Sequence, residues 1–144
     1  MIRHAGLIAQ RVGGRWIGVL IEGPSGAGKS DLALRAIGQG FRLVADDRVV
    51  LWTSGGRLYG RAPEALHGLI EVRGLDVIRA DALSLAEVGL VARLGEPDRI
   101  PDPEFHDILG VSIPAMTTSA FEESAPAKLS RALSSFDAAH NRRI

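Results

Sequence analysis

The sequence has 144 residues, which fits one domain spanning residues 1–144, since domains typically hold about 100–150 residues. Its 17 basic and 17 acidic residues cancel, so the chain as a whole carries no electrostatic signal for nucleic acid or for an acidic membrane surface. Cysteine is absent, which excludes disulfides, thiolate catalysis and cysteine-based zinc sites. The longest apolar run, residues 16–21, is too short to cross a bilayer, and the N-terminus lacks a charged-then-apolar signal segment. We therefore expect a cytoplasmic protein.

The chain opens with the pattern of an antiparallel hairpin. Small and apolar residues favour a strand over Arg3–Gln10, and Gly13-Gly14 supplies a turn into a second strand over residues 16–21. A helical pattern follows over residues 31–37 and is expected to end at the glycines at 38 or 40.

The next elements are also dominated by strands. Residues 41–45 have the composition of a strand that leads directly into two aspartates. A second hairpin is predicted from strands over 49–52 and 57–60, joined by a turn over 53–56. The first half of the chain therefore predicts a mixed sheet rich in hairpins.

The second half has weaker signals, apart from its end. Apolar positions 125, 129, 132, 133 and 136 fall on one helical face and predict an amphipathic C-terminal helix. In chain order we expect a helical turn over 63–67, an extended segment over 70–78, a strand over 88–94, a surface loop over 95–107, a strand over 108–113, a helix over 125–139 and a frayed tail over 141–144.

A glycine-rich loop between the second strand and the first helix matches G-x-x-x-x-G-K-S. Its residues are Gly23, Pro24, Ser25, Gly26, Ala27, Gly28, Lys29 and Ser30. In such a P-loop, backbone N–H groups curl around phosphate oxygens, the lysine reaches the outer phosphates and the hydroxyl binds Mg²⁺. A plain turn between strand and helix does not require the closing lysine and serine. The motif therefore predicts a nucleotide or another polyphosphate as ligand.

Two neighbouring aspartates, Asp46 and Asp47, follow the strand predicted over residues 41–45. Acidic residues at this place in a P-loop protein approach Mg²⁺ and the terminal phosphate, whereas the alternative is a solvated corner. Because consecutive strand residues face opposite sides, a strand continuing through both would direct only one carboxylate at the phosphate. The sequence does not say which one.

Two further groups could belong to the same site. Alternation along an extended segment places Glu71 and Arg73 on one face, where they could serve a metal and a phosphate or form a surface ion pair. His4 lies in the strand expected to pair with the one that leads into the P-loop, so it could lie at the rim of the phosphate site or be structural.

Several of these segments together resemble the catalytic domain of bacterial HPr kinase/phosphorylase. They are His4, the P-loop, the run L-V-A-D-D over 43–47, R-A-P-E over 61–64 and L-I-E-V-R-G-L over 69–75, in the family's order and approximate spacing. The resemblance covers about residues 4–115. It implies an α/β P-loop core with a mixed, hairpin-rich sheet, similar to the core of phosphoenolpyruvate carboxykinase.

The resemblance also implies an activity and a set of roles. The family uses ATP or pyrophosphate to phosphorylate a serine of HPr, a small carrier protein of the sugar phosphotransferase system, and can reverse the reaction with inorganic phosphate. By position, Lys29 contacts phosphate, Ser30 and Glu71 are Mg²⁺ ligands, and His4 is an active-site histidine. The pair Asp46 and Asp47 supplies the general base, for which we favour Asp47. Apart from the resemblance, we expect Arg73 to act as a second cation for the transition state.

The sequence departs from the family in three places. Family members generally carry a separate N-terminal domain, and this chain begins near the catalytic domain. The segment after residues 71–74 is shorter. The family's arginine-bearing P-x-R-P-G-R-N stretch is expected after residues 113–117, where this chain has T-S-A-F-E-E-S over 118–124. The resemblance therefore implies kinase activity and leaves the reverse phosphorolysis open. Family members form hexamers, and whether this chain is a homo-oligomer stays open as well.

Two other functions compete with a serine kinase acting on an HPr-like carrier. One is a regulatory module that senses nucleotide or phosphate without transferring a phosphoryl group, although the retained aspartate pair favours an enzyme. The other is a small-molecule kinase, which needs a lid for which the chain has little length. We expect neither nucleic acid nor a membrane as a partner.

Overall fold

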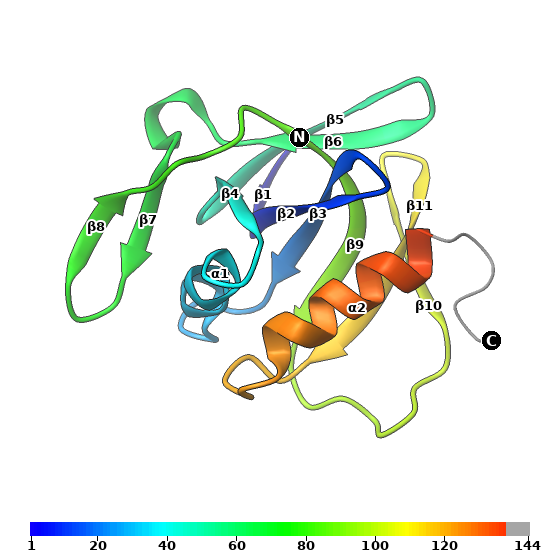
Figure 1. The fold of residues 1–144 in the computed structure, drawn as a ribbon. Helices are drawn as coiled ribbons and strands as arrows, with labels where there is room; N and C mark the ends of the chain where they lie inside the picture. Colours follow the sequence, from blue (N-terminus) through cyan, green and yellow to red (C-terminus); the bar gives the residue numbers. More distant parts are fainter. Residues whose placement is uncertain (138–144) are drawn as a thin grey trace.

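The computed structural model describes residues 1–137, which form a curled sheet, a separate two-stranded hairpin and two helices (Figure 1). The elements are β1 (Ile2–His4), β2 (Gly6–Val12), β3 (Arg15–Glu22), α1 (Lys29–Ile37), β4 (Arg42–Ala45), β5 (Arg48–Ser54), β6 (Arg57–Arg61), the short 3-10 helix η1 (Glu64–Leu66), β7 (Leu69–Val72), β8 (Asp76–Arg79), β9 (Ala86–Leu94), β10 (Glu104–Ile108), β11 (Val111–Thr118) and α2 (Ala125–Asp137). Within this part of the chain, neither helix has the length and apolar character needed to cross a membrane.

The large sheet has nine strands arranged around β9. Its main path runs β1-β5-β6-β9-β3-β2-β4, and β11 adds to β9 and carries β10 at its outer edge. The start of β9 pairs antiparallel with β6, whereas its end pairs parallel with β11, and β3 runs parallel to β9 along the other side. The sheet therefore branches at β9, where β6 and β11 pair with different parts of the same strand.

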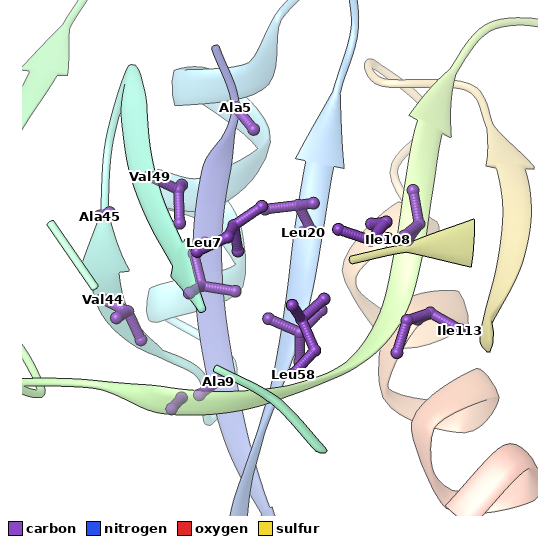
Figure 2. Close-up of a cluster of buried hydrophobic side chains, with 14 of the residues drawn as sticks. Ala5, Leu7, Ala9, Leu20, Val44, Ala45, Val49, Leu58, Ile108 and Ile113 are labelled. Carbon is purple, nitrogen blue, oxygen red and sulfur yellow. The ribbon is translucent and has the colours of Figure 1, made fainter. Parts of the chain in front are cut away.

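The strands around β3 bury both of their faces, which explains why their sequences are apolar without a gap. In β2, Leu7 and Ala9 contribute to the cluster between parts of the curled sheet (Figure 2), whereas Ile8 faces the cluster beneath the helices. That second cluster contains Leu32 of α1 and Leu129 of α2, so both helices cover the same side of the sheet (Figure 1). Alternate side chains of one strand thus build two cores.

One edge of the sheet collects the ends of several strands. β2 is antiparallel to both β3 and β4, so β3 and β4 run in the same direction. β9 is parallel to β3, and β11 is parallel to β9. The segments that leave the carboxyl ends of β3, β4 and β11 therefore emerge at the same edge, which is where open α/β sheets usually bind ligands.

The predictions for the first half of the chain are largely confirmed. Both hairpins form, with their turns at Gly13-Gly14 and Gly55-Gly56, and η1 falls within the expected helical turn. The helix predicted over 31–37 begins two residues earlier, at Lys29. The strand predicted over Arg3–Gln10 is divided at Ala5, because β1 leaves β2 to pair with β5.

The predictions for the second half contain three errors. The extended segment expected over 70–78 is divided by a turn at Gly74 into the antiparallel strands β7 and β8. The single strand expected over 108–113 is wrong, because Leu109 and Gly110 both have positive φ and make the turn between β10 and β11. The surface loop expected over 95–107 ends at residue 103, where β10 begins. Strand β9 and helix α2 are confirmed, although residues 138 and 139 of the predicted helix and the tail over 141–144 lie outside the described residues.

Candidate active site

The glycine-rich loop, residues 23–30, connects the carboxyl end of β3 to the first turn of α1. Gly26 and Gly28 have φ values of 82° and 102°, in the left-handed region that side chains with a Cβ avoid. A Cβ atom added to Gly23 would lie 3.2 Å from Cβ of Leu94, so this end of the loop packs closely on β9. Two of the motif's glycines are thus required by backbone conformation and the third by close approach.

The Lys29 side chain curls back over this loop. Its Nζ donates hydrogen bonds to the carbonyl oxygens of Gly23 at 2.7 Å and Pro24 at 3.1 Å. The ammonium group is therefore positioned above the turn of the backbone, where it could bind an anionic ligand held by the loop.

Asp46 is buried at the end of β4 and joins three elements. The Ser30 hydroxyl of α1 donates to its carboxylate at 2.8 Å, and the backbone N–H of Glu71 in β7 donates to it at 3.0 Å. The side chain is inside the protein, since only 6% of Asp46 is exposed. Its carboxylate thus links the two residues predicted to hold Mg²⁺, Ser30 and Glu71.

Asp47, unlike the buried Asp46, is exposed to solvent. Its side chain is 64% exposed, and its Oδ1 lies 3.9 Å from Nδ1 of His4, while its Oδ2 lies 3.7 Å from Nε of Arg48. The residue has a φ of 71°, and the N–H of Arg48 donates to the carbonyl of Asp46 across it at 2.8 Å. A three-residue turn with positive φ at its centre is rare and strained. Strain of this kind at a non-glycine residue is concentrated at functional sites.

A pocket of about 280 Å³ brings these elements together. Its lining residues come from the glycine-rich loop, α1, the turn after β4, the β7–β8 hairpin and the turn after β11: Ser25, Gly26, Gly28, Lys29, Ser30, Asp31, Asp47, Glu71, Arg73 and Phe121. Its volume lies just below the range of about 300–1,000 Å³ that is typical of sites for drug-sized ligands. Lys29, Arg73 and the backbone N–H groups of the loop suit phosphate oxygens, whereas the three carboxylates of Asp31, Asp47 and Glu71 suit a cation bound beside them.

The residues of this pocket could supply only part of a Mg²⁺ coordination shell, as is usual in phosphate-transfer sites. No cluster of three or more His, Cys, Asp or Glu side chains suited to a metal occurs within residues 1–137. Mg²⁺ in kinases usually takes one or two protein ligands, and its remaining ligands are water and substrate phosphates. The Ser30 hydroxyl and the Glu71 carboxylate would supply that minimal set.

Two predictions about the arrangement of these residues need correction. The strand β4 ends before both aspartates, so the backbone turn, rather than strand alternation, separates their side chains. β7 ends at Val72, which leaves Arg73 in the hairpin turn and not on a strand face with Glu71, although both line the pocket.

His4 also lies in an unexpected strand. It belongs to β1, whose residues pair with β5, and not to β2, which is the partner of the strand before the glycine-rich loop. It nevertheless reaches the rim of the site through Asp47.

Sequence reasoning missed two residues of the pocket. Asp31 could have been found because it follows the motif serine directly. Phe121 gave no such signal, since it lies about 90 residues beyond the motif in a segment that departs from the family pattern.

The fold and pocket define a mixed α/β protein with a curled sheet and a compact polar pocket at its strand ends. Residues 5–87 match the family described as HPr Serine kinase C-terminal domain, so the chain belongs to that family. It is similar to the HPr kinase/phosphorylase of Clostridium perfringens, with 39% identity over 111 residues, which are 67% of this chain and 36% of that protein. A shorter match to the HPr kinase/phosphorylase of Brevibacillus brevis has 52% identity over 63 residues, which are 43% of this chain and 20% of that protein.

A solved structure extends the likeness to nearly the whole chain. The Hpr(Ser) kinase/phosphatase from Coxiella burnetii superposes with a TM-score of 0.75 and 26% identity, covering 90% of this chain and 91% of that one. The chain spans little more than a third of the length of the full curated relatives it matches.

Proposed function

We propose that this chain is an ATP-dependent kinase that phosphorylates a serine of an HPr-like carrier protein in the cytoplasm. The proposal is carried by one observation: in a member of the HPr serine kinase C-terminal domain family, the glycine-rich loop, Asp47, Glu71 and Arg73 line a single pocket, and Asp46 accepts a hydrogen bond from Ser30 of its wall. The relatives named as HPr kinase/phosphorylases support the same acceptor.

Phosphate binding falls to the loop and its lysine. The phosphates would lie against the turn at Gly26 and Gly28, and Lys29 would exchange its two backbone carbonyl partners for phosphate oxygens. Ser30 and Glu71 would hold Mg²⁺, which when bound would neutralise charge on the phosphates. Arg73 lines the same pocket and would add a second positive charge at the transferring group.

Proton transfer falls to Asp47. An attacking serine must lose its proton, and a carboxylate within hydrogen-bond reach can accept it. Asp47 faces the pocket and solvent, so a serine presented from outside can reach it. Asp46 is buried and already accepts hydrogen bonds from Ser30 and Glu71, which suits it to positioning these residues. His4 would orient the Asp47 carboxylate from its outer side.

The experiment is a transfer assay with Mg²⁺, labelled ATP and the HPr-like protein from the same organism. Phosphoserine should form with the wild type and be lost in Lys29→Ala and Asp47→Asn. Matched controls are Arg131→Ala, which removes an exposed cation of α2, and Asp102→Asn, which changes an exposed loop aspartate. Both controls should retain activity, and circular dichroism should show that all four variants are folded.

Two results would contradict the proposal. Tight, Lys29-dependent ATP binding without transfer to the carrier would favour a nucleotide-sensing module instead of an enzyme. Transfer that survives Asp47→Asn would remove Asp47 from the role of base. Replacing ATP by pyrophosphate, and adding inorganic phosphate to phosphorylated carrier, tests the donor and the reverse reaction in the same assay.

A further inference from the structure

Phe121 is a large apolar side chain held at the mouth of the phosphate pocket. It is 67% exposed and lies in the turn between β11 and α2. The ring lies over the glycine-rich loop, since a Cβ atom added to Gly28 would lie 2.7 Å from its Cζ. Single exposed apolar residues are common and need no explanation, but this one forms part of the wall of a polar pocket.

The backbone on both sides of Phe121 is fixed to α1. The guanidinium of Arg35 donates hydrogen bonds to the carbonyl oxygens of Ala120 and Glu122, and its Nε donates to Asp31 at 2.9 Å. Lys128 of α2 bonds the Glu122 carboxylate at 2.6 Å, which holds the pKa of Glu122 below its usual range. Both helices therefore fix the turn, and the contacts of Ala120 and Glu122 keep the Phe121 ring exposed.

A second hollow is also lined by Phe121. It has a volume of about 210 Å³, and its wall includes Pro24, Leu94, Glu96, Ser119 and Ala120 in addition to Phe121. This recess and the phosphate pocket are each smaller than typical sites for drug-sized ligands, and they share Phe121 and the glycine-rich loop as a common wall. A ligand with an anionic part and a flat aromatic part would occupy both.

We propose that Phe121 stacks against the base of the phosphoryl donor, with the phosphates in the Lys29 pocket and the nucleoside directed toward the recess. This assignment rests on the proposed function and makes the donor a nucleoside triphosphate rather than pyrophosphate. An aromatic face binds any base by stacking, because every base has a π-face. The rigid support from Arg35 reduces the conformational entropy that ordering the ring would otherwise cost.

The test compares two ligands that share phosphates and differ in the base. Binding of MgATP and of magnesium tripolyphosphate is measured by calorimetry for the wild type, Phe121→Leu and Phe121→Trp. Leucine keeps apolar bulk over Gly28 without an aromatic face, whereas tryptophan keeps the face. We expect Phe121→Leu to weaken ATP about tenfold and tripolyphosphate less than twofold, and Phe121→Trp to retain ATP binding. Phe105→Leu, on β10, is the control and should change neither affinity.

The outcomes separate this proposal from the one on which it rests. An equal loss of both ligands in Phe121→Leu would mean that the ring acts by packing on the loop, and would overturn the base site. The same holds if the wild type binds ATP no more tightly than tripolyphosphate, or if Phe121→Leu changes only the KM of the protein acceptor. In each of these cases, loss of both ligands in Lys29→Ala would still support the proposed phosphate site. If Lys29→Ala loses neither ligand, both proposals fail.

Discussion

At the scale of single residues, two adjacent carboxylates occupy opposite environments. Asp46 is buried and accepts hydrogen bonds from Ser30 and Glu71, whereas Asp47 is exposed at a positive φ. Asparagine has the same shape as aspartate and tolerates positive φ. We expect Asp47→Asn to leave stability and ATP affinity nearly unchanged while transfer falls by about 10²-fold or more, the range for loss of a general base.

The matched variant at the neighbouring position should behave in the opposite way. Asp46→Asn leaves one amide oxygen to serve the two donors that the carboxylate now accepts, so we expect a loss of about 1–2 kcal/mol of unfolding free energy. Thermal unfolding and transfer rates of both variants, measured side by side, check the assignment. It is wrong if Asp46→Asn is fully stable and Asp47→Asn is the variant that unfolds early.

Thr118, at the end of β11, is the one buried hydroxyl for which the described residues offer no hydrogen-bond partner. A buried unpaired polar group carries a desolvation cost of about 1–3 kcal/mol. Thr118→Val should therefore raise the unfolding free energy by about 1 kcal/mol, seen as a higher urea midpoint. Thr117→Val is the control, because the Thr117 hydroxyl already bonds Arg93 at 3.3 Å and its removal should not stabilise. A lower midpoint for Thr118→Val would show that the hydroxyl has a partner in solution.

At the scale of elements, a cluster of charges joins β9 to β10. Glu104 bonds the ring of His106 at 3.0 Å and the guanidinium of Arg93 at 2.9 Å, and these two partners hold the pKa of the Glu104 carboxyl below its usual value of 4.5. A lowered folded-state pKa means that this contribution to stability is present above about pH 4.5 and is lost as pH falls through the folded-state pKa.

A pH series on Glu104→Gln tests this charge cluster. The wild type should exceed the variant in stability near neutral pH by less than about 1 kcal/mol, because the pair is largely exposed and screened by solvent. The difference should shrink as the pH falls below 4.5. Glu96→Gln removes a carboxylate for which the described residues give no ion pair, and should show no such pH-dependent difference. If the difference in unfolding free energy between the wild type and Glu104→Gln stays constant as the pH falls well below 4.5, the lowered pKa of Glu104 does not contribute to stability.

The elements also show where sequence patterns lose information. The glycine-rich motif, its flanking strand and helix, and the two early hairpins were predictable because glycine turns and apolar runs mark them directly. The β10–β11 turn was not, because Leu109 adopts a φ of 51° that a leucine gives no reason to expect, so the apolar run around it resembled one strand. The separation of Asp46 from Asp47 was hidden for the same reason, since a turn with positive φ replaced the predicted alternation.

At the scale of the whole molecule, the site exists because distant segments end at one edge of the sheet. The carboxyl ends of β3, β4 and β11 bring the glycine-rich loop, the aspartates and the turn carrying Phe121 together from positions about 100 residues apart. No local pattern contains this convergence, which depends on strand order and direction. The family resemblance supplied the first two segments, and the third departs from the family pattern and became visible only in the fold.

Arg35 is the side chain that ties the third segment to the other two. It joins α1 to the carbonyl oxygens of Ala120 and Glu122, so its loss should release the turn while leaving the loop and aspartates in place. We expect Arg35→Met to lower the unfolding free energy by about 1–2 kcal/mol, because two hydrogen bonds to a charged group are lost at a partly exposed site. Arg131→Met, on α2, removes an exposed guanidinium for which the described residues show no hydrogen bond or ion pair, and serves as the control.

The ligand response distinguishes this tie from simple stability. Arg35→Met should reduce the preference for ATP over tripolyphosphate, as Phe121→Leu does. Its affinity for tripolyphosphate should persist, because the glycine-rich loop still binds the phosphates. Calorimetry at a temperature where the variant is fully folded separates the two effects. A variant that is destabilised but keeps the full preference for ATP would show that the ring is positioned without Arg35, by packing on Gly28 alone.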